Sequence, residues 1–328
     1  MQPTIAQFLR CPVSGRDLIL EEVSRQDGGD VVEGALVEQS AGAVYEIHSR
    51  LPLLLGPGRK AVDDFAVLLS AHGEQHGFAE AVRRLSSGDI PYPVHDELGL
   101  LVSAADQREA DFREAPDFWD TFSRNRLIQQ QLNAIDAHWD ALEELWLRGD
   151  VNLADTILDV GTGWGGAFHH LLEHGPQDAL VFGLDTAFLN LKVAQGRAAH
   201  AGFEQAHFVV GDISEPPFAP RLFESVVSWY GIAATPGFRR TLEGLTLVMA
   251  PGAAFAAAWT PVVLDMDGLA SADELHTLSA RFDMPVDPDE AARGAEDAGF
   301  EDVEVIEAGP IYILQGRNPA EGAPPHVP

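Results

Sequence analysis

The sequence predicts an α/β fold whose second half is a mainly parallel sheet. From residue 151 onward, strand-like runs alternate with helical segments, which is the pattern of parallel α/β sheets. The first of these strands runs into a helix through the glycine-rich turn GTGWGG at 161–166. Near the end, EDVEVIEAGPIYILQGR at 301–317 reads as two strands joined at Gly309-Pro310, which would place one antiparallel strand on the sheet.

The first 150 residues differ from the rest in their predicted secondary structure. Residues 1–57 predict a small β domain, because short β runs at 17–23, 34–39 and 43–55 are separated by glycine-rich turns. Residues 58–150 read as mainly helical and are expected to form a linker or lid. Their clearest signal is an apolar stripe with spacings of four and three, formed by Ile128, Leu132, Ile135, Trp139, Leu142 and Trp146.

Residues 151–317 are expected to form one domain. We predict its first five strands at 156–160, 179–184, 206–210, 223–229 and 253–259. We predict the helices between them at 165–174, 187–201 and 237–249. A further helix ends at Gly299, and the proline-rich tail 318–328 is expected to be disordered.

The charge balance limits the possible partners. The 328 residues include 21 basic and 51 acidic side chains, a formal net charge of −30, so the surface should repel nucleic acid. The single cysteine, Cys11, excludes an intramolecular disulfide. No signal peptide is visible at the start, and Pro251, Gly252 and Pro261 interrupt the charge-free stretch 244–264, so we expect no membrane span and a cytoplasmic location.

The glycine-rich turn suits a ligand that lies against main chain. Gly161, Gly163 and Gly165 bring backbone amides to a helix N-terminus with no Cβ in the way. The spacing satisfies both G-x-G-x-x-G and G-x-G-x-G, and either match alone is weak. Close packing of the turn is the alternative explanation.

Three carboxylates follow the ends of three successive predicted strands. Asp159 precedes the first glycine by two residues, and Asp185 and Asp212 end the next two strands. Open α/β sheets bind ligands at this edge. A diphosphate would be repelled there, whereas a cationic ligand with a ribose and an adenine would gain charge-assisted hydrogen bonds of roughly 1.5–3 kcal/mol each. Helix capping is the alternative role for these side chains.

Residues 153–316 resemble the class I S-adenosylmethionine-dependent methyltransferases, through LDVGTGWGG, GLDTA, GDISEPPF and ESVVSWYGI in the family's order. The resemblance implies a Rossmann-like, seven-stranded methyltransferase sheet and S-adenosylmethionine as cofactor. It implies that the methionine moiety lies on the glycine turn near Asp159, the ribose at Asp185 and the adenine at Asp212. The implied cofactor contacts are Asp159, Gly161, Thr162, Gly163, Gly165, Asp185, Thr186, Asp212, Ile213, Ser228 and Trp229.

The first 55 residues resemble the Trm112-like zinc-ribbon module with its metal ligands replaced. Cys11 remains, but Ser14, Glu38 and Ala41 stand at the other ligand positions, so we expect no metal. The resemblance implies a lid or a partner-contact role, with a homodimer or another protein as the partner.

The resemblance leaves the chemistry partly open. The segment at the end of the fourth strand, SWYG at 228–231, would face the methyl group, and Tyr230 could orient an acceptor there. His169 is the candidate general base, with a packing or solvent-facing position as its alternative. The expected function is methyl transfer to a small molecule, with a protein acceptor as a variant. A non-catalytic cofactor-binding or partner-binding protein and an NAD-dependent oxidoreductase are the alternatives.

Overall fold

The structure is a computed structural model that describes residues 1–25, 29–56, 136–163, 165–232, 237–259, 288–308 and 311–320. Most of the expected linker or lid, 58–150, lies outside these ranges, as does most of the tail expected to be disordered. The described end of the helical region is α7 (Asp136–Arg148), where Leu142 and Trp146 of the predicted stripe are buried. A short 3-10 helix, η2 (Val151–Leu153), connects α7 to the sheet.

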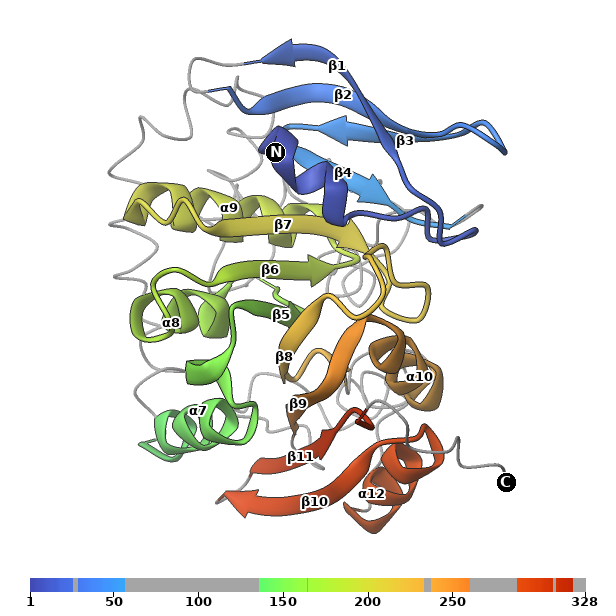
Figure 1. Cartoon of the computed structure of the whole chain (residues 1–328). Helices are drawn as coiled ribbons and strands as arrows, with labels where there is room; N and C mark the ends of the chain where they lie inside the picture. Colours follow the sequence, from blue (N-terminus) through green and yellow to red (C-terminus); the bar gives the residue numbers. More distant parts are fainter. Residues whose placement is uncertain are drawn as a thin grey trace, which may run out of the picture.

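A seven-stranded Rossmann-like sheet forms the second half of the described chain (Figure 1). The strand order is β7-β6-β5-β8-β9-β11-β10. The first five run parallel, and β11 is antiparallel to both β9 and β10, as the predicted hairpin requires. The bounds are β5 (Thr156–Val160), β6 (Leu180–Asp185), β7 (Ala206–Gly211), β8 (Phe223–Trp229), β9 (Met249–Trp259), β10 (Glu301–Ala308) and β11 (Ile311–Arg317).

Helices cover both faces of this sheet (Figure 1). On one face, α7, α8 (Gly166–His174) and α9 (Phe188–Ala201) bury apolar side chains in one hydrophobic cluster. On the other, α10 (Phe238–Val248) and α12 (Pro288–Asp297) contribute to a second cluster. The three helices predicted between strands agree with the structure to within one residue at each end.

The N-terminal β segment is part of the same sheet, although the sequence suggested a separate domain. It consists of η1 (Pro3–Phe8), β1 (Ile19–Arg25), β2 (Val31–Glu38), β3 (Ala43–His48) and β4 (Leu51–Leu54). The predicted run 43–55 is two strands, because Ser49 and Arg50 adopt left-handed φ values of 51° and 67° and reverse the chain. β4 then pairs in parallel with β7, Leu53 opposite Val210 and Leu54 opposite Gly211, so eleven described strands form one sheet.

The charge-free stretch 244–264 supplies the end of α10 and all of β9 within the described ranges. No helix of the described part of the chain is both long and apolar enough to cross a membrane.

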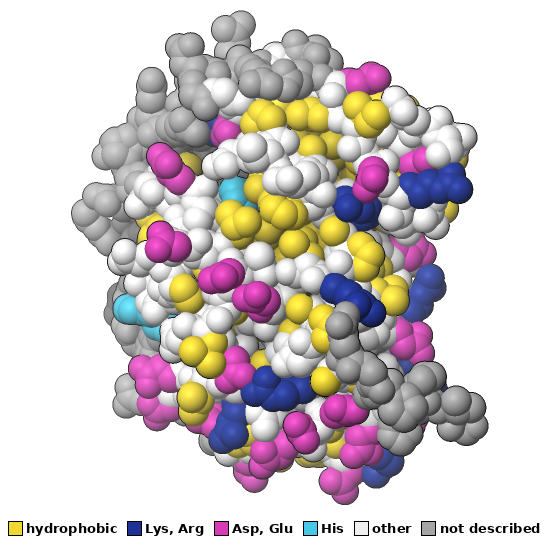
Figure 2. Space-filling model, in the orientation of Figure 1, with side chains coloured by type: hydrophobic (Ala, Val, Ile, Leu, Met, Phe, Trp, Pro, Cys, Tyr) yellow, Lys and Arg dark blue, Asp and Glu magenta, His cyan; other side chains and the backbone are white. Residues whose placement is uncertain are grey.

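Salt should stabilise this fold. Acidic side chains gather at the lower end of the face in Figure 2, and the net charge is −30. Repulsion between them weakens when the Debye length falls from about 10 Å at 0.1 M salt to about 3 Å at 1 M. We expect the thermal unfolding midpoint to rise by several degrees over this range of NaCl. Sucrose of equal osmolality is the control for solute exclusion, and an unchanged or lower midpoint in salt would contradict the expectation.

Candidate functional site

Strand pairing brings the three predicted aspartates to one edge of the sheet. β5, β6 and β7 are neighbours in parallel register, with Asp159 opposite Gly183 and Asp185 opposite Val210. Asp212 follows the last residue of β7 directly. The carboxyl ends of the three strands therefore lie together beside the glycine turn, at the edge where open α/β sheets have their ligand crevice.

The three predicted glycines of the turn serve different purposes. All have left-handed φ values, 72° at Gly161, 56° at Gly163 and 77° at Gly165. A Cβ on Gly161 would overlap the main chain of Gly231, and one on Gly165 would lie 2.9 Å from Ala194 Cβ. Close packing thus explains Gly161 and Gly165. At Gly163 the nearest described atom to an added Cβ, chain neighbours aside, would be 4.0 Å away, so packing against the described residues does not require this glycine.

The carboxylate of Asp185 holds the turn in place. One oxygen accepts a hydrogen bond from Gly163 N at 2.7 Å, and the other accepts from Ala187 N at 2.8 Å, beside the half-buried Thr186. These bonds tie the turn to the end of β6 and the start of α9.

Asp159 is a buried carboxylate that is not satisfied by the described protein. Its residue is 2% exposed, and its Oδ2 atom has no hydrogen-bond partner among the described residues. The Thr162 hydroxyl donates to the Asp159 backbone oxygen at 3.0 Å, which makes Thr162 a brace of the turn. Burial raises the pKa of Asp159 to about 7; a hydrogen bond with the Thr162 side chain opposes this rise, and the nearby charge of Asp185 adds to it. A cationic ligand group would relieve both effects.

Asp212 and Ile213 lie at the far side of the crevice. Asp212 is half-buried and its Oδ1 accepts from Ser214 N at 2.8 Å. Ile213 is 2% exposed and its side chain belongs to a hydrophobic cluster. Ile213 thus supports the turn from below, whereas the carboxylate of Asp212 stays at the edge of the sheet.

The end of β8 closes against the glycine turn. Ser228 is fully buried, and its hydroxyl donates to Val160 O at 2.7 Å and accepts from Ile232 N at 2.9 Å. Its hydroxyl therefore joins two strand ends, and the side chain exposes no surface for the cofactor contact that was predicted. Trp229 and Tyr230 are half-buried, with their rings edge to face at 5.1 Å.

Tyr230 combines backbone strain with a high pKa. Its φ of 63° is left-handed, which is uncommon for a bulky residue, and such strain concentrates at functional sites. Burial raises the pKa of Tyr230 to about 12. The phenol stays protonated at neutral pH, so it can donate a hydrogen bond but cannot act as a general base.

The position of His169 does not favour its predicted role as a base. Its Nε2 lies 3.4 Å from Glu173 Oε1 on the same helix, and its ring meets Phe203 edge to face at 5.6 Å. Phe203 follows the end of α9, at the edge of the sheet where β7 begins. The side chain of His169 thus points from α8 toward the end of α9, and its ring takes part in helix packing.

A cavity of about 530 Å³ lies at that opposite edge of the sheet. It separates the N-terminal segment from the end of α9, and its lining includes Asp30, Arg50, Gln195, Phe203 and His207. None of the predicted site residues lines it, so it is distinct from the crevice at the carboxyl edge.

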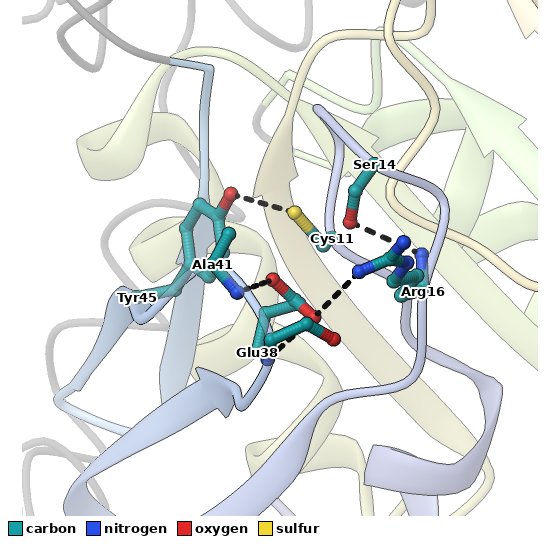
Figure 3. Close-up of polar contacts among 7 residues, drawn as sticks. Cys11, Ser14, Arg16, Glu38, Ala41 and Tyr45 are labelled. Carbon is teal, nitrogen blue, oxygen red and sulfur yellow. Dashed lines mark hydrogen bonds and ion pairs between the residues drawn. The ribbon is translucent and has the colours of Figure 1, made fainter.

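Cys11, Ser14, Glu38 and Ala41, the positions compared with metal ligands in the sequence analysis, lie in two facing turns of the N-terminal segment (Figure 3). Cys11 Sγ is 3.1 Å from Tyr45 Oη. The buried Glu38 carboxylate accepts from Ala41 N at 2.7 Å and lies 3.8 Å from an Arg16 nitrogen. These contacts join the two turns through hydrogen bonds and an ion pair.

Comparison with known proteins assigns the central part of the chain. Residues 157–252 match the family model described as a methyltransferase domain, so this part of the chain is a methyltransferase domain. It includes the glycine turn, the three aspartates and Tyr230.

Each of the similar proteins named below matches only part of this chain. Demethylmenaquinone methyltransferase of Oceanobacillus iheyensis is 30% identical over 105 residues, which are 32% of this chain and 44% of that protein. The chain therefore spans less than half the length of this curated relative. Phosphoethanolamine N-methyltransferase 2 of Haemonchus contortus, solved with S-adenosyl-L-methionine, is 17% identical with a TM-score of 0.47, covering 55% of this chain and 53% of that one. The Haloferax volcanii complex between the Trm112 methyltransferase activator and the putative methyltransferase gives 20% identity and a TM-score of 0.45, covering 61% of this chain and 96% of that one.

Asp159 should destabilise the ligand-free protein above neutral pH. Between about pH 4 and about pH 7, the raised pKa means that Asp159 keeps its proton in the folded state and has lost it in the unfolded state. The free energy of unfolding therefore falls as the pH rises through this range and stays low above it. Asp159→Asn removes the penalty. We expect it to raise the free energy of unfolding at pH 8 by on the order of 2–4 kcal/mol, and by little at pH 4. Urea unfolding at both pH values measures this difference.

The exposed Asp178 provides the matched control. Asp178→Asn should change stability by less than about 0.5 kcal/mol at either pH. Equal stability of the Asp159→Asn variant and the parent protein at pH 8 would show that burial of the ionised carboxylate does not destabilise the protein.

Proposed function

We propose that the chain is an S-adenosylmethionine-dependent methyltransferase that acts on a small molecule. The observation that carries this proposal is the buried Asp159 Oδ2, which has no hydrogen-bond partner within the described part of the chain, next to a turn where the described residues leave room at Gly163. An ammonium group satisfies such an oxygen, whereas a diphosphate would be repelled by it. This argues against the NAD-dependent alternative, which would place a diphosphate on the turn.

The crevice residues fit the parts of this cofactor. Asp159 would accept from the methionine ammonium group, and Asp185, which follows at the end of the neighbouring strand and holds the turn through Gly163 N, would accept from the ribose hydroxyls. Asp212, whose carboxylate lies at the end of the third strand and is oriented by Ser214 N, would accept from the adenine amino group. When bound, the cofactor supplies a methyl group already activated by the sulfonium, so the protein mainly positions the acceptor.

The end of β8 is proposed to meet the acceptor. Tyr230 would donate a hydrogen bond that orients it, and Trp229 would provide an aromatic wall. Ser228 and Thr162 would act indirectly, by holding the turn, and Ile213 by packing below it. Some acceptors would need a general base, and we do not assign this role to His169.

We also propose that the N-terminal segment is a Trm112-like module that needs no metal. The Cys11–Tyr45 and Arg16–Glu38 contacts join the turns that a zinc ion would otherwise join. β1, the outermost strand among the described residues, is where a protein partner or a second copy of the chain would pair.

Cofactor binding should depend on the ionisation of Asp159. Because the pKa of this carboxyl is about 7, the ionised fraction, and with it the affinity for S-adenosylhomocysteine, should fall about tenfold per pH unit below 7. Asp159→Asn should weaken binding by about 10- to 100-fold at pH 8 and remove this dependence. Calorimetric titration from pH 5.5 to 8.5 measures both effects.

Methylthioadenosine is the matched control ligand, because it lacks the amino acid part and should bind with no such pH dependence. Binding of NAD in place of S-adenosylhomocysteine would refute the proposed function.

The acceptor class can be tested by supplying labelled S-adenosylmethionine to the protein with a cell extract separated into a small-molecule filtrate and a protein fraction. We expect transfer to a component of the filtrate. Label in the protein fraction alone would point to a protein acceptor, and tight cofactor binding without transfer to either fraction to a non-catalytic role.

Tyr230→Phe should lower kcat about tenfold or more with little change in cofactor affinity, because it removes one oriented hydrogen bond.

A further inference from the structure

The turn that carries Asp212 is held at its base by its own backbone. Asp212 O accepts from Glu215 N at 3.0 Å, and the Asp212 carboxylate accepts from Ser214 N. The chain then continues through Pro216 and Pro217 to the buried Phe218. The orientation of the carboxylate therefore depends on what fixes the turn 212–219 as a whole.

The N-terminal segment pairs with the far end of this turn. Residues Phe8–Arg10, which we name the clasp, form an antiparallel bridge in which Leu9 lies opposite Phe218. Arg10 N donates to Pro217 O at 2.9 Å, and Ala219 N donates to Phe8 O at 2.7 Å. Leu9 and Phe218 are both buried, at 0% and 3% exposure, so this contact is part of the core.

β4 and α10 hold the near end of the turn. Leu54 of β4 pairs with Gly211, the residue before Asp212, and β4 lies beside β7 in Figure 1. A Cβ on Gly244 of α10 would overlap Ile213 O, so the helix backbone rests directly on the turn. Arg240 of the same helix pairs with Glu215 at 3.1 Å. The N-terminal segment thus holds the turn at both ends, through β4 at Gly211 and through the clasp at Pro217–Ala219.

We infer that the clasp is part of the nucleoside site. It sets the position of the Asp212 carboxylate, and this position determines the selectivity for adenine over a 6-oxopurine. The inference rests on the proposed function. Adenine presents an amino donor at this position, which a carboxylate accepts, whereas hypoxanthine presents a carbonyl oxygen that a carboxylate repels. Such discrimination requires the carboxylate to be placed within hydrogen-bonding distance, so a turn released at one end would lose it.

The test compares S-adenosylhomocysteine with S-inosylhomocysteine in the full chain, by calorimetric titration at pH 8. Arg10→Pro deletes the N–H that donates to Pro217 O, and the extended Leu9, with φ −89° and ψ 149°, suits a following proline. Arg10→Ala keeps that N–H and is the matched control. Ala219→Pro deletes the opposite bond, to Phe8 O, and Ala219→Ser is its control.

We expect the parent protein to bind the adenine compound at least about tenfold more tightly, and each proline variant to lower this ratio about fivefold or more. The two controls should keep the parent ratio within about twofold. The second proline variant keeps the test open if the first does not fold, as judged by circular dichroism.

Each contrary result has a distinct meaning. A folded proline variant that retains the parent ratio overturns the role of the clasp. Equal binding of the two compounds by the parent protein overturns the inference while leaving the proposed function intact. Failure of the parent protein to bind either compound overturns the proposed function itself.

Discussion

The site depends on the contact between the main chains of Gly161 and Gly231. No side chain fits between them, so the end of β8 rests directly on the glycine turn. Ser228 joins the same two strand ends through its hydroxyl, and Asp185 fastens the other side of the turn through Gly163 N. With its flanks fixed in this way, the turn offers its main chain to a ligand at Gly163, and Asp159 remains buried beneath it.

Local signals in the sequence predicted the main sheet and most of the crevice. Buried apolar runs bounded by glycine or proline located β5 to β8 to within one residue, and the carboxyl-edge rule brought Asp159, Asp185 and Asp212 together. Side-chain direction was harder to predict. Helical spacing cannot decide which of two adjacent histidines faces a neighbouring helix, and a strand-end serine reads the same whether it faces a ligand or a second strand.

The joining of the N-terminal segment to the sheet had no local signal. It requires a chain reversal at Ser49-Arg50, where neither residue is one of those that usually adopt left-handed φ values. It also pairs Leu53 with Val210, and parallel pairing between distant residues leaves no pattern in either strand alone. The sequence therefore indicated the β runs and turns of the segment, but not its place in the fold.

The pairing of β4 with β7 has a consequence for biosynthesis. β4 leaves the ribosome long before β7 is made, and at a typical 5–20 residues per second the interval is on the order of ten seconds or more. During that time the nascent N-terminal sheet has an open edge, which is a hazard for aggregation. Closing so long a loop is also slow, because chain entropy opposes it until the new contacts form. Translation rate and chaperone capture thus become determinants of the yield of this protein.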